Sequence, residues 1–313
     1  VLWFGGQQII AGSMGRGELI SFITYITQVM ISLMMLSMFF MQLLRGAASK
    51  ERILAVWNTS SEIIEKEDPV YDLKDGSIAF KNVHFQYPGS SEQVLRNINL
   101  EIESGETIGV IGSTGSSKST LIQLIPRLYD ATSGKVLVGG SNVKDYNIEA
   151  LRDQVAFVLQ KNTLFSGTIR ENMRWGKEDA TDGEIIEALK HAQAWEFVSK
   201  YEAGLDHHVE QGGSNFSGGQ RQRLTIARAL IKKPKIIILD DSTSAVDMAT
   251  DAKIQKTFKD ELSDITTIII GQRIASIENA DRIIVLHRGE IESVGDHDTL
   301  LATSQIYSEV YAS

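Results

Sequence analysis

The chain has 313 residues, enough for about two domains of about 150 residues each. It carries 31 Lys and Arg against 40 Asp and Glu, a net charge of −9, and it has no dense basic block, so we do not expect it to bind nucleic acid. The absence of cysteine excludes disulfides, thiolate catalysis, iron–sulfur clusters and cysteine zinc sites.

An apolar run near the N-terminus is predicted to cross a membrane. Residues 19–44 carry no charge and are rich in Leu, Ile, Met and Phe. As a helix with about 1.5 Å rise per residue, the run spans a hydrocarbon core of about 30 Å. The alternative is a buried helix of a soluble protein, but such helices are usually shorter and amphipathic. Arg45, Lys50 and Arg52 follow the run, which places its C-terminal side in the cytoplasm.

The composition divides the chain into three parts. We interpret residues 1–58 as the C-terminal part of a transmembrane domain, residues 59–76 as a hydrophilic linker and residues 77–313 as a separate cytoplasmic domain. The chain begins with Val, has no signal-peptide pattern, and starts with apolar residues typical of the end of an earlier span. We therefore expect a piece of a longer protein that passes through the cell membrane several times.

The cytoplasmic part alternates short apolar strands with helical patterns. This alternation predicts an α/β fold with a largely parallel sheet. The predicted strands are residues 78–85, 107–111, 155–159, 236–239 and 267–270, and the predicted helices are residues 118–128, 182–200, 220–231 and 249–262.

A glycine-rich turn follows the strand at 107–111 and leads into a helix. Here the backbone N–H groups and the helix dipole favour a bound phosphate. Lys118 is placed for the β and γ phosphates, and the Ser119 hydroxyl is placed for Mg²⁺. The alternative is an ordinary Gly/Ser turn that caps a helix. The predicted phosphate-binding residues of this turn are Gly112, Ser113, Thr114, Gly115, Ser116, Ser117, Lys118, Ser119 and Thr120.

Two further features bear on this turn. Ser117 stands where the strict pattern G-x-x-x-x-G-K-[ST] has its second glycine. A serine fits there if its φ is negative, so we expect nucleotide binding to be retained.

The apolar strand at 236–239 ends in Asp240, which is placed to reach Mg²⁺ through water. Asp241 follows as a second carboxylate that could orient an attacking water. The alternative for this pair is a turn or helix-cap cluster.

Together these motifs resemble the nucleotide-binding domain of an ABC transporter, of the exporter type that has a membrane helix ahead of the ATPase. The most specific element is NFSGGQRQR at residues 215–223, which is similar to the family signature. Ser217 and Gln220 also have capping-box spacing, and Gly218 and Gly219 leave the helix N-terminus bare for a phosphate presented by another subunit.

The resemblance implies a fold, cofactors and further site residues. The fold is an α/β P-loop ABC ATPase with a mostly parallel sheet core, an antiparallel β subdomain and a helical signature subdomain at about residues 161–224; the cofactors are ATP and Mg²⁺. Tyr87 matches the aromatic that stacks on adenine, although a tyrosine in a strand-end turn is the alternative. Gln160 matches the glutamine that contacts Mg²⁺ and senses the membrane domain. Glu210 lies in a segment that resembles the loop coupling to the membrane domain. Asp247 lies in a segment that resembles the loop reaching the partner's site.

Two residues depart from the family pattern. Asp241 stands where active ATPases have glutamate, and a reactant misplaced by about 1 Å can react about a hundredfold more slowly. Gln272 replaces a histidine that touches the γ-phosphate, and it cannot carry a charge. The predicted catalytic residues are Asp241, Gln272 and Gln160, and the predicted metal ligands are Ser119, Gln160 and Asp240. With Ser117, these departures resemble the degenerate subunit of a heterodimeric exporter, whose signature completes the site of its partner.

The expected function is ATP-driven export of a drug-like, lipid or other hydrophobic solute, with a second half-transporter as partner. The alternatives are a nucleotide-gated subunit that does not hydrolyse ATP and, less favoured, a homodimeric exporter half. A soluble ABC ATPase that acts on DNA or ribosomes conflicts with the apolar run and the acidic charge. The methionines at 30, 34, 35, 38 and 41 fit either an adaptable solute surface or helix packing.

Overall fold

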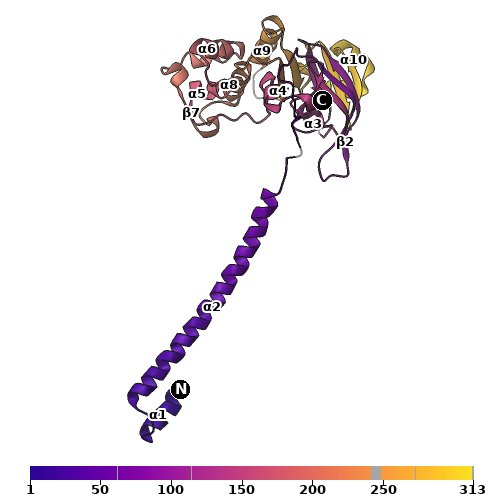
Figure 1. The fold of residues 1–313 in the computed structure, drawn as a ribbon. Coiled ribbons are helices and arrows are strands. Elements are labelled where there is room, and N and C mark those ends of the chain that lie inside the picture. Colours follow the sequence, from indigo (N-terminus) through magenta and orange to yellow (C-terminus); the bar gives the residue numbers. More distant parts are fainter. Residues whose placement is uncertain (62, 114, 241–247, 272, 312–313) are drawn as a thin grey trace. The chain divides into compact units, whose positions relative to one another are not determined.

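The computed structural model describes residues 1–61, 63–113, 115–240, 248–271 and 273–311 (Figure 1). The chain divides into two compact units, Val1–Glu62 and Ile63–Ser313. The predicted linker, residues 59–76, is thus shared between them. Each unit is described by itself below.

The N-terminal unit consists of the short helix α1 (Leu2–Ile10) and the long helix α2 (Arg16–Trp57). Among the described residues, α2 is one helix whose length and composition suffice to cross a membrane. Its interior hydroxyls donate to the carbonyl four residues earlier, as Thr24 does to Ile20 and Ser32 to Gln28, each at 2.9 Å. A hydroxyl paired in this way can lie in an apolar medium at little cost. The helix contains the predicted span, residues 19–44, and extends beyond it at both ends.

The core of the second unit is a six-stranded sheet in the order β12-β11-β3-β10-β9-β6. Neighbours pair in parallel, except that β12 runs antiparallel to β11. The central strands are continuous apolar runs buried on both faces, as helices on both sides of a parallel sheet require. The strands are β3 (Thr107–Ile111), β6 (Val155–Val158), β9 (Ile236–Asp240), β10 (Thr266–Ile270), β11 (Arg282–His287) and β12 (Glu290–Gly295).

An antiparallel sheet in the order β2-β1-β4-β5 packs on this core. Its strands alternate buried and exposed residues, since only one face meets the hydrophobic cluster. The strands are β1 (Ile78–Gln86), β2 (Gln93–Ile102), β4 (Ser133–Val138) and β5 (Ser141–Asn142). The same cluster contains side chains of the helix α3 (Lys118–Gln123) and of α4 (Ile148–Gln154), so this sheet lies against the elements that follow the glycine-rich turn.

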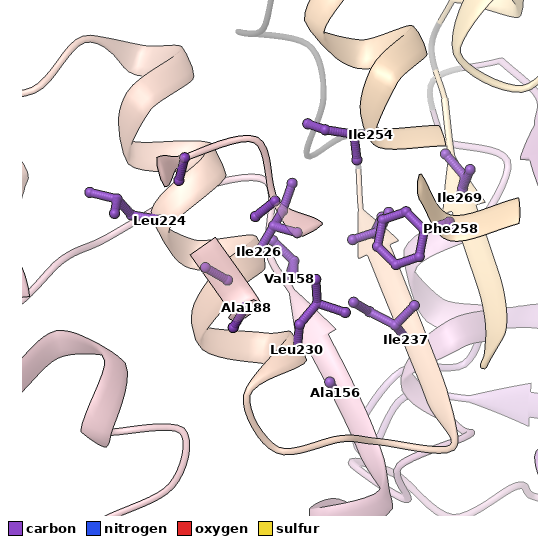
Figure 2. Close-up of a cluster of buried hydrophobic side chains, with 14 of the residues drawn as sticks. Ala156, Val158, Ala188, Leu224, Ile226, Leu230, Ile237, Ile254, Phe258 and Ile269 are labelled. Atoms are coloured by element: carbon purple, nitrogen blue, oxygen red, sulfur yellow. The ribbon is translucent and has the colours of Figure 1, made fainter. Parts of the chain in front are cut away.

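Helices gather at one end of the second unit around α8 (Gly218–Leu230) (Figure 1). In Figure 2, Ile226 and Leu230 of α8 lie beside Val158 of β6 and Ile237 of β9, which joins the helices to the sheet. The other elements are α5 (Ile169–Arg174), α6 (Asp182–His191), α7 (Trp195–Val198), α9 (Met248–Asp260), α10 (His297–Thr303), α11 (Gln305–Tyr311), a small sheet of β7 (Gly167–Thr168) and β8 (His208–Val209), and the 3₁₀ turns Val143–Asp145, Gly204–Asp206, Gln211–Gly213 and Ile274–Ser276.

The predicted α/β P-loop fold is confirmed, and two predicted helices are too long. The helix expected at 182–200 is interrupted after α6, where Gln193 has a positive φ of 56° and α7 starts anew. The helix expected at 118–128 ends at Gln123. Pro126 disfavours a helical residue before it, and Arg127 has a φ of 51°.

Candidate nucleotide-binding site

The glycine-rich turn connects β3 to α3 at the carboxyl edge of the core sheet. A Cβ at Gly112 would collide with the backbone carbonyl of Leu286 on β11, so only glycine lets the chain turn here. The Lys118 ammonium donates to the carbonyl of Gly112 at 2.7 Å and to that of Ser113 at 3.2 Å. The lysine therefore lies across the turn, where a phosphate is expected.

The side chains of the turn fit a phosphate-bearing ligand. Ser116 is 2% exposed, and its hydroxyl has no hydrogen-bond partner among the described residues. A buried hydroxyl without a partner is costly, so a ligand oxygen near it would be favourable. Ser119, the predicted Mg²⁺ ligand, is exposed at the first turn of α3. Thr114 lies outside the described residues.

Ser117 has a left-handed backbone, with φ 75° and ψ 22°. We expected a negative φ, at which a serine fits without strain, and this expectation is wrong. Glycine adopts this conformation freely, whereas a Cβ costs about 1–2 kcal/mol there. The second glycine of the strict pattern is thus missing at the point where the backbone geometry calls for it.

The sheet brings the other predicted ligands to the same edge. Asp240 is the last residue of β9, and Gln160 follows the end of β6, which is the parallel neighbour of β9. Carboxyl ends of parallel strands meet at one edge, where α/β folds bind their ligands. Asp240 is partly buried and Gln160 is exposed, as oxygen donors to a hydrated cation need to be. The predicted residues Asp241, Asp247 and Gln272 lie outside the described residues.

Tyr87 follows β1 and lies beside α3. Its hydroxyl is 2.9 Å from the hydroxyl of Thr120, and its ring makes edge contacts with Phe85 and Tyr129 at centroid distances of 4.9 and 5.2 Å. The structure thus brings together two residues that the sequence assigned to the same ligand, Tyr87 and Thr120. Stacking of this ring on adenine stays a prediction.

The signature sequence forms a capped helix start. The Ser217 hydroxyl accepts the N–H of Gln220 at 3.2 Å, and the Gln220 side chain accepts the N–H of Ser217 at 2.9 Å, which confirms the predicted capping box. Gly218 and Gly219 add no side chain at this N-terminus. Asn215 accepts the N–H of Glu210 at 3.1 Å, so the predicted coupling loop is tied to the signature.

A groove beside Gln160 was not predicted from the sequence. It has a volume of about 430 Å³, lies between β6 and α8, and is lined in part by Leu159, Phe165 and Trp175. The two aromatic rings stack with centroids 4.7 Å apart, and both are exposed. Burial lowers the pKa of Arg228, whose guanidinium lies 5.6 Å from the Phe165 ring. In the sequence, Phe165 and Trp175 are aromatic residues within a polar stretch, which is the one local signal of such a groove. That they lie together follows only from the fold.

Known proteins are similar to this chain in sequence and in fold. The ABC transporter family matches residues 95–244. The ABC transporter ATP-binding protein YfiB of Bacillus subtilis is 43% identical over 313 residues, which is 100% of this chain and 54% of YfiB. The ATP-dependent lipid A-core flippase of Syntrophus aciditrophicus is 35% identical over 312 residues, which is 99% of this chain and 52% of the flippase. The chain spans about half the length of these curated relatives.

A solved structure agrees over nearly the whole chain. It is the structure of a bacterial Atm1-family ABC exporter with ATP bound, with a TM-score of 0.81 and 30% identity over 98% of this chain and 55% of that one. The fold and the phosphate loop define a P-loop ABC ATPase. The signature and these matches are more specific: the chain carries an ABC transporter ATP-binding domain and is similar, over nearly its whole length, to part of an ABC exporter.

Proposed function

We propose that the chain is the ATP-binding part of one half of an ABC exporter, in which MgATP binding and hydrolysis drive solute export across the cell membrane. The observation that carries the proposal is that one domain holds both a phosphate loop with Lys118 and the N-terminus of α8. That N-terminus is capped by Ser217 and begins with two glycines, which add no side chains to it. In the proposed head-to-tail dimer, this N-terminus of one subunit closes the phosphate loop of the other. The proposed longer protein contributes further membrane helices.

The roles of the residues follow from their chemistry. Lys118 exchanges two loop carbonyls for phosphate oxygens, which are stronger acceptors because they are charged. Ser119, Asp240 and Gln160 supply oxygens to Mg²⁺, and Tyr87 holds the adenine. MgATP, when bound, would supply a γ-phosphoryl group that is transferred to water, with ADP as the leaving group. Asp241 would orient that water, and Gln272 would donate a hydrogen bond to the phosphate.

The site of this chain is proposed to be the slower one of a heterodimer. Ser117 supports this assignment, because the second glycine of the strict phosphate-loop pattern is missing at a position with a left-handed backbone. The shorter Asp241 and the uncharged Gln272 support it from the sequence. Ser217, Gly218 and Gly219 then complete a faster site on the partner. A homodimer, or a subunit that binds ATP without hydrolysing it, is the remaining alternative.

The proposed cargo is a hydrophobic solute, drug-like or lipid. The apolar side chains of α2 support this class, as does the lipid A-core flippase among the relatives. Solute contacts would lie mostly on the membrane helices of the longer protein, so the class is proposed and no single compound.

Lys118→Ala tests the proposal by equilibrium titration of the full chain in detergent with a fluorescent ATP analogue and Mg²⁺. Loss of the ammonium removes charge-assisted hydrogen bonds to phosphate, so the affinity should fall by about tenfold or more. Lys190→Ala is the matched control, because this exposed lysine lies on α6 and should leave the affinity unchanged. Equal affinities of Lys118→Ala and the native chain would overturn the proposal.

A further inference from the structure

The segment that follows the membrane helix along the chain is anchored to the ATPase unit. We call residues 63–73 the strap. The carbonyl of Ile64 accepts a hydrogen bond from Arg127 at 2.9 Å. Arg127 is 2% exposed, and its guanidinium also binds both carboxylate oxygens of Asp130, at 2.8 and 3.2 Å. A buried guanidinium loses much free energy if it gives up such partners, so the strap is held firmly at this point.

A second anchor lies at the start of α4. The Glu65 carboxylate accepts the N–H of Ile148 at 2.8 Å and a side-chain N–H of Asn147 at 3.1 Å. The carboxylate lies at the N-terminus of α4, whose N-cap is Asn147, and a negative charge is favourable there. Further on, Val70 donates its N–H to the carbonyl of Asp145 at 2.8 Å, and Asn147 donates its N–H to the carbonyl of Val70 at 2.9 Å. These two bonds form a parallel bridge.

Both anchors are on elements that lead to the nucleotide site. The turn that holds Arg127 directly follows α3, whose first residue is Lys118. Arg152 of α4 donates to the carbonyls of Pro126 and Arg127, at 3.1 and 2.8 Å, so α4 and this turn are tied together. In turn, α4 runs directly into β6, and Gln160 follows β6.

We propose that the strap is a second coupling element, through which the phosphate loop and the membrane helix α2 influence each other. Arg127 and Glu65 are its positioning residues. The inference rests on the proposed function and adds a route that does not use the Glu210 loop. Phosphate held by Lys118 restrains α3 and the turn after it, and Arg127 passes this restraint to Ile64 of the strap, which follows α2 along the chain. Because coupling is reciprocal, the strap must respond to nucleotide.

The test is hydrogen exchange of the full chain in phosphatidylcholine–phosphatidylglycerol nanodiscs, with and without MgATP. In the native chain, MgATP should slow exchange of strap peptides covering 63–73 by about fivefold or more, the lower end of typical coupling. Peptides covering 112–120 report binding itself. The decisive quantity is the exchange rate of the strap peptides without MgATP divided by their rate with MgATP. If an anchor only stabilises the local structure, its removal changes both rates equally and leaves this ratio unchanged.

Two variants remove the anchors one at a time. Arg127→Lys keeps the charge beside Asp130 but cannot also reach Ile64, and Glu65→Ala removes the acceptor of the Ile148 N–H while Asn147 remains the N-cap of α4. In both, the strap response should fall to about twofold or less while residues 112–120 still respond. Glu65→Gln keeps an acceptor oxygen and should restore most of the response. The matched control is Glu67→Ala, an exposed glutamate of the same strap, which should respond as the native chain does.

Several outcomes would overturn the inference. One is a native chain whose 112–120 peptides respond to MgATP while its strap does not. Another is a full strap response in Glu65→Ala, which decides the matter even where Arg127→Lys fails to fold. If neither region of the native chain responds, nucleotide binding itself is refuted and the strap proposal falls with it.

Discussion

The left-handed backbone at Ser117 puts a Cβ where the loop pattern normally has none. The sequence shows that the second glycine is missing, but it does not give the sign of φ. A glycine in the strict pattern permits a positive φ without requiring one, so the sign at this position is known only from the structure. The identity of the loop is therefore predictable from local sequence, whereas its strain is not.

Ser117→Gly should stabilise the chain. Removing the Cβ at a φ of 75° should raise the free energy of unfolding by about 1 kcal/mol, since glycine accepts this conformation at no steric cost. Urea denaturation of the second unit, followed by circular dichroism in detergent, measures the change. Ser113→Gly is the control, because Ser113 is exposed and outside the positive-φ set, so the same deletion there should not stabilise. Equal gains in the two variants would contradict the strain argument.

At the scale of elements, the cap of α6 combines a local capping pattern with a partner from outside the helix. Thr181 and Glu184 form the capping box that their spacing predicts, with the Thr181 N–H donating to the Glu184 carboxylate at 3.0 Å. Lys177 also donates to that carboxylate, at 2.6 Å. This hydrogen bond, together with those from Thr181, lowers the pKa of Glu184 from 4.5 to about 2.

The depressed pKa predicts how stability depends on pH. A carboxyl whose pKa is lower in the folded chain stabilises it above pH 4.5, and this contribution is lost as the pH falls toward 2. Glu184→Gln keeps an acceptor for Thr181 but no charge for Lys177. Its urea midpoint should lie below that of the native chain at pH 7, and the gap should close between pH 4.5 and about 2. A gap that is constant over this range would show that the charge contributes nothing.

Helix ends and the strap mark the limits of prediction from sequence. The predicted strand 107–111 agrees with β3 at both ends. A short apolar run that leads into a glycine-rich turn can be recognised as a strand from local sequence alone. The break after α6 depends on Arg223, which donates to the carbonyl of Gln193 at 2.8 Å from α8. The strap depends on pairs such as Glu65 with Ile148. Such contacts between distant segments leave no periodic signal in either one.

For the molecule as a whole, the two motifs that define the site are local and the surfaces around them are not. The phosphate loop and the signature are short, contiguous patterns, so both could be located in the sequence. The groove of Phe165 and Trp175 is built from β6, α8 and the loops between, so its existence depended on the fold. Among its described residues the chain carries one candidate membrane span, α2.

The assignment of a slow site makes a prediction about turnover. Purified alone, the chain should bind MgATP and release phosphate slowly, because Asp241 is one methylene shorter than the glutamate of active ATPases. Asp241→Glu should raise the rate of phosphate release, by up to about a hundredfold if the setback of about 1 Å is the main defect. Asp241→Asn is the control and should give no gain, since an amide is no base. Rapid phosphate release by a verified homodimer of the native chain would refute the assignment, because the signature would then be serving a competent site on an identical subunit.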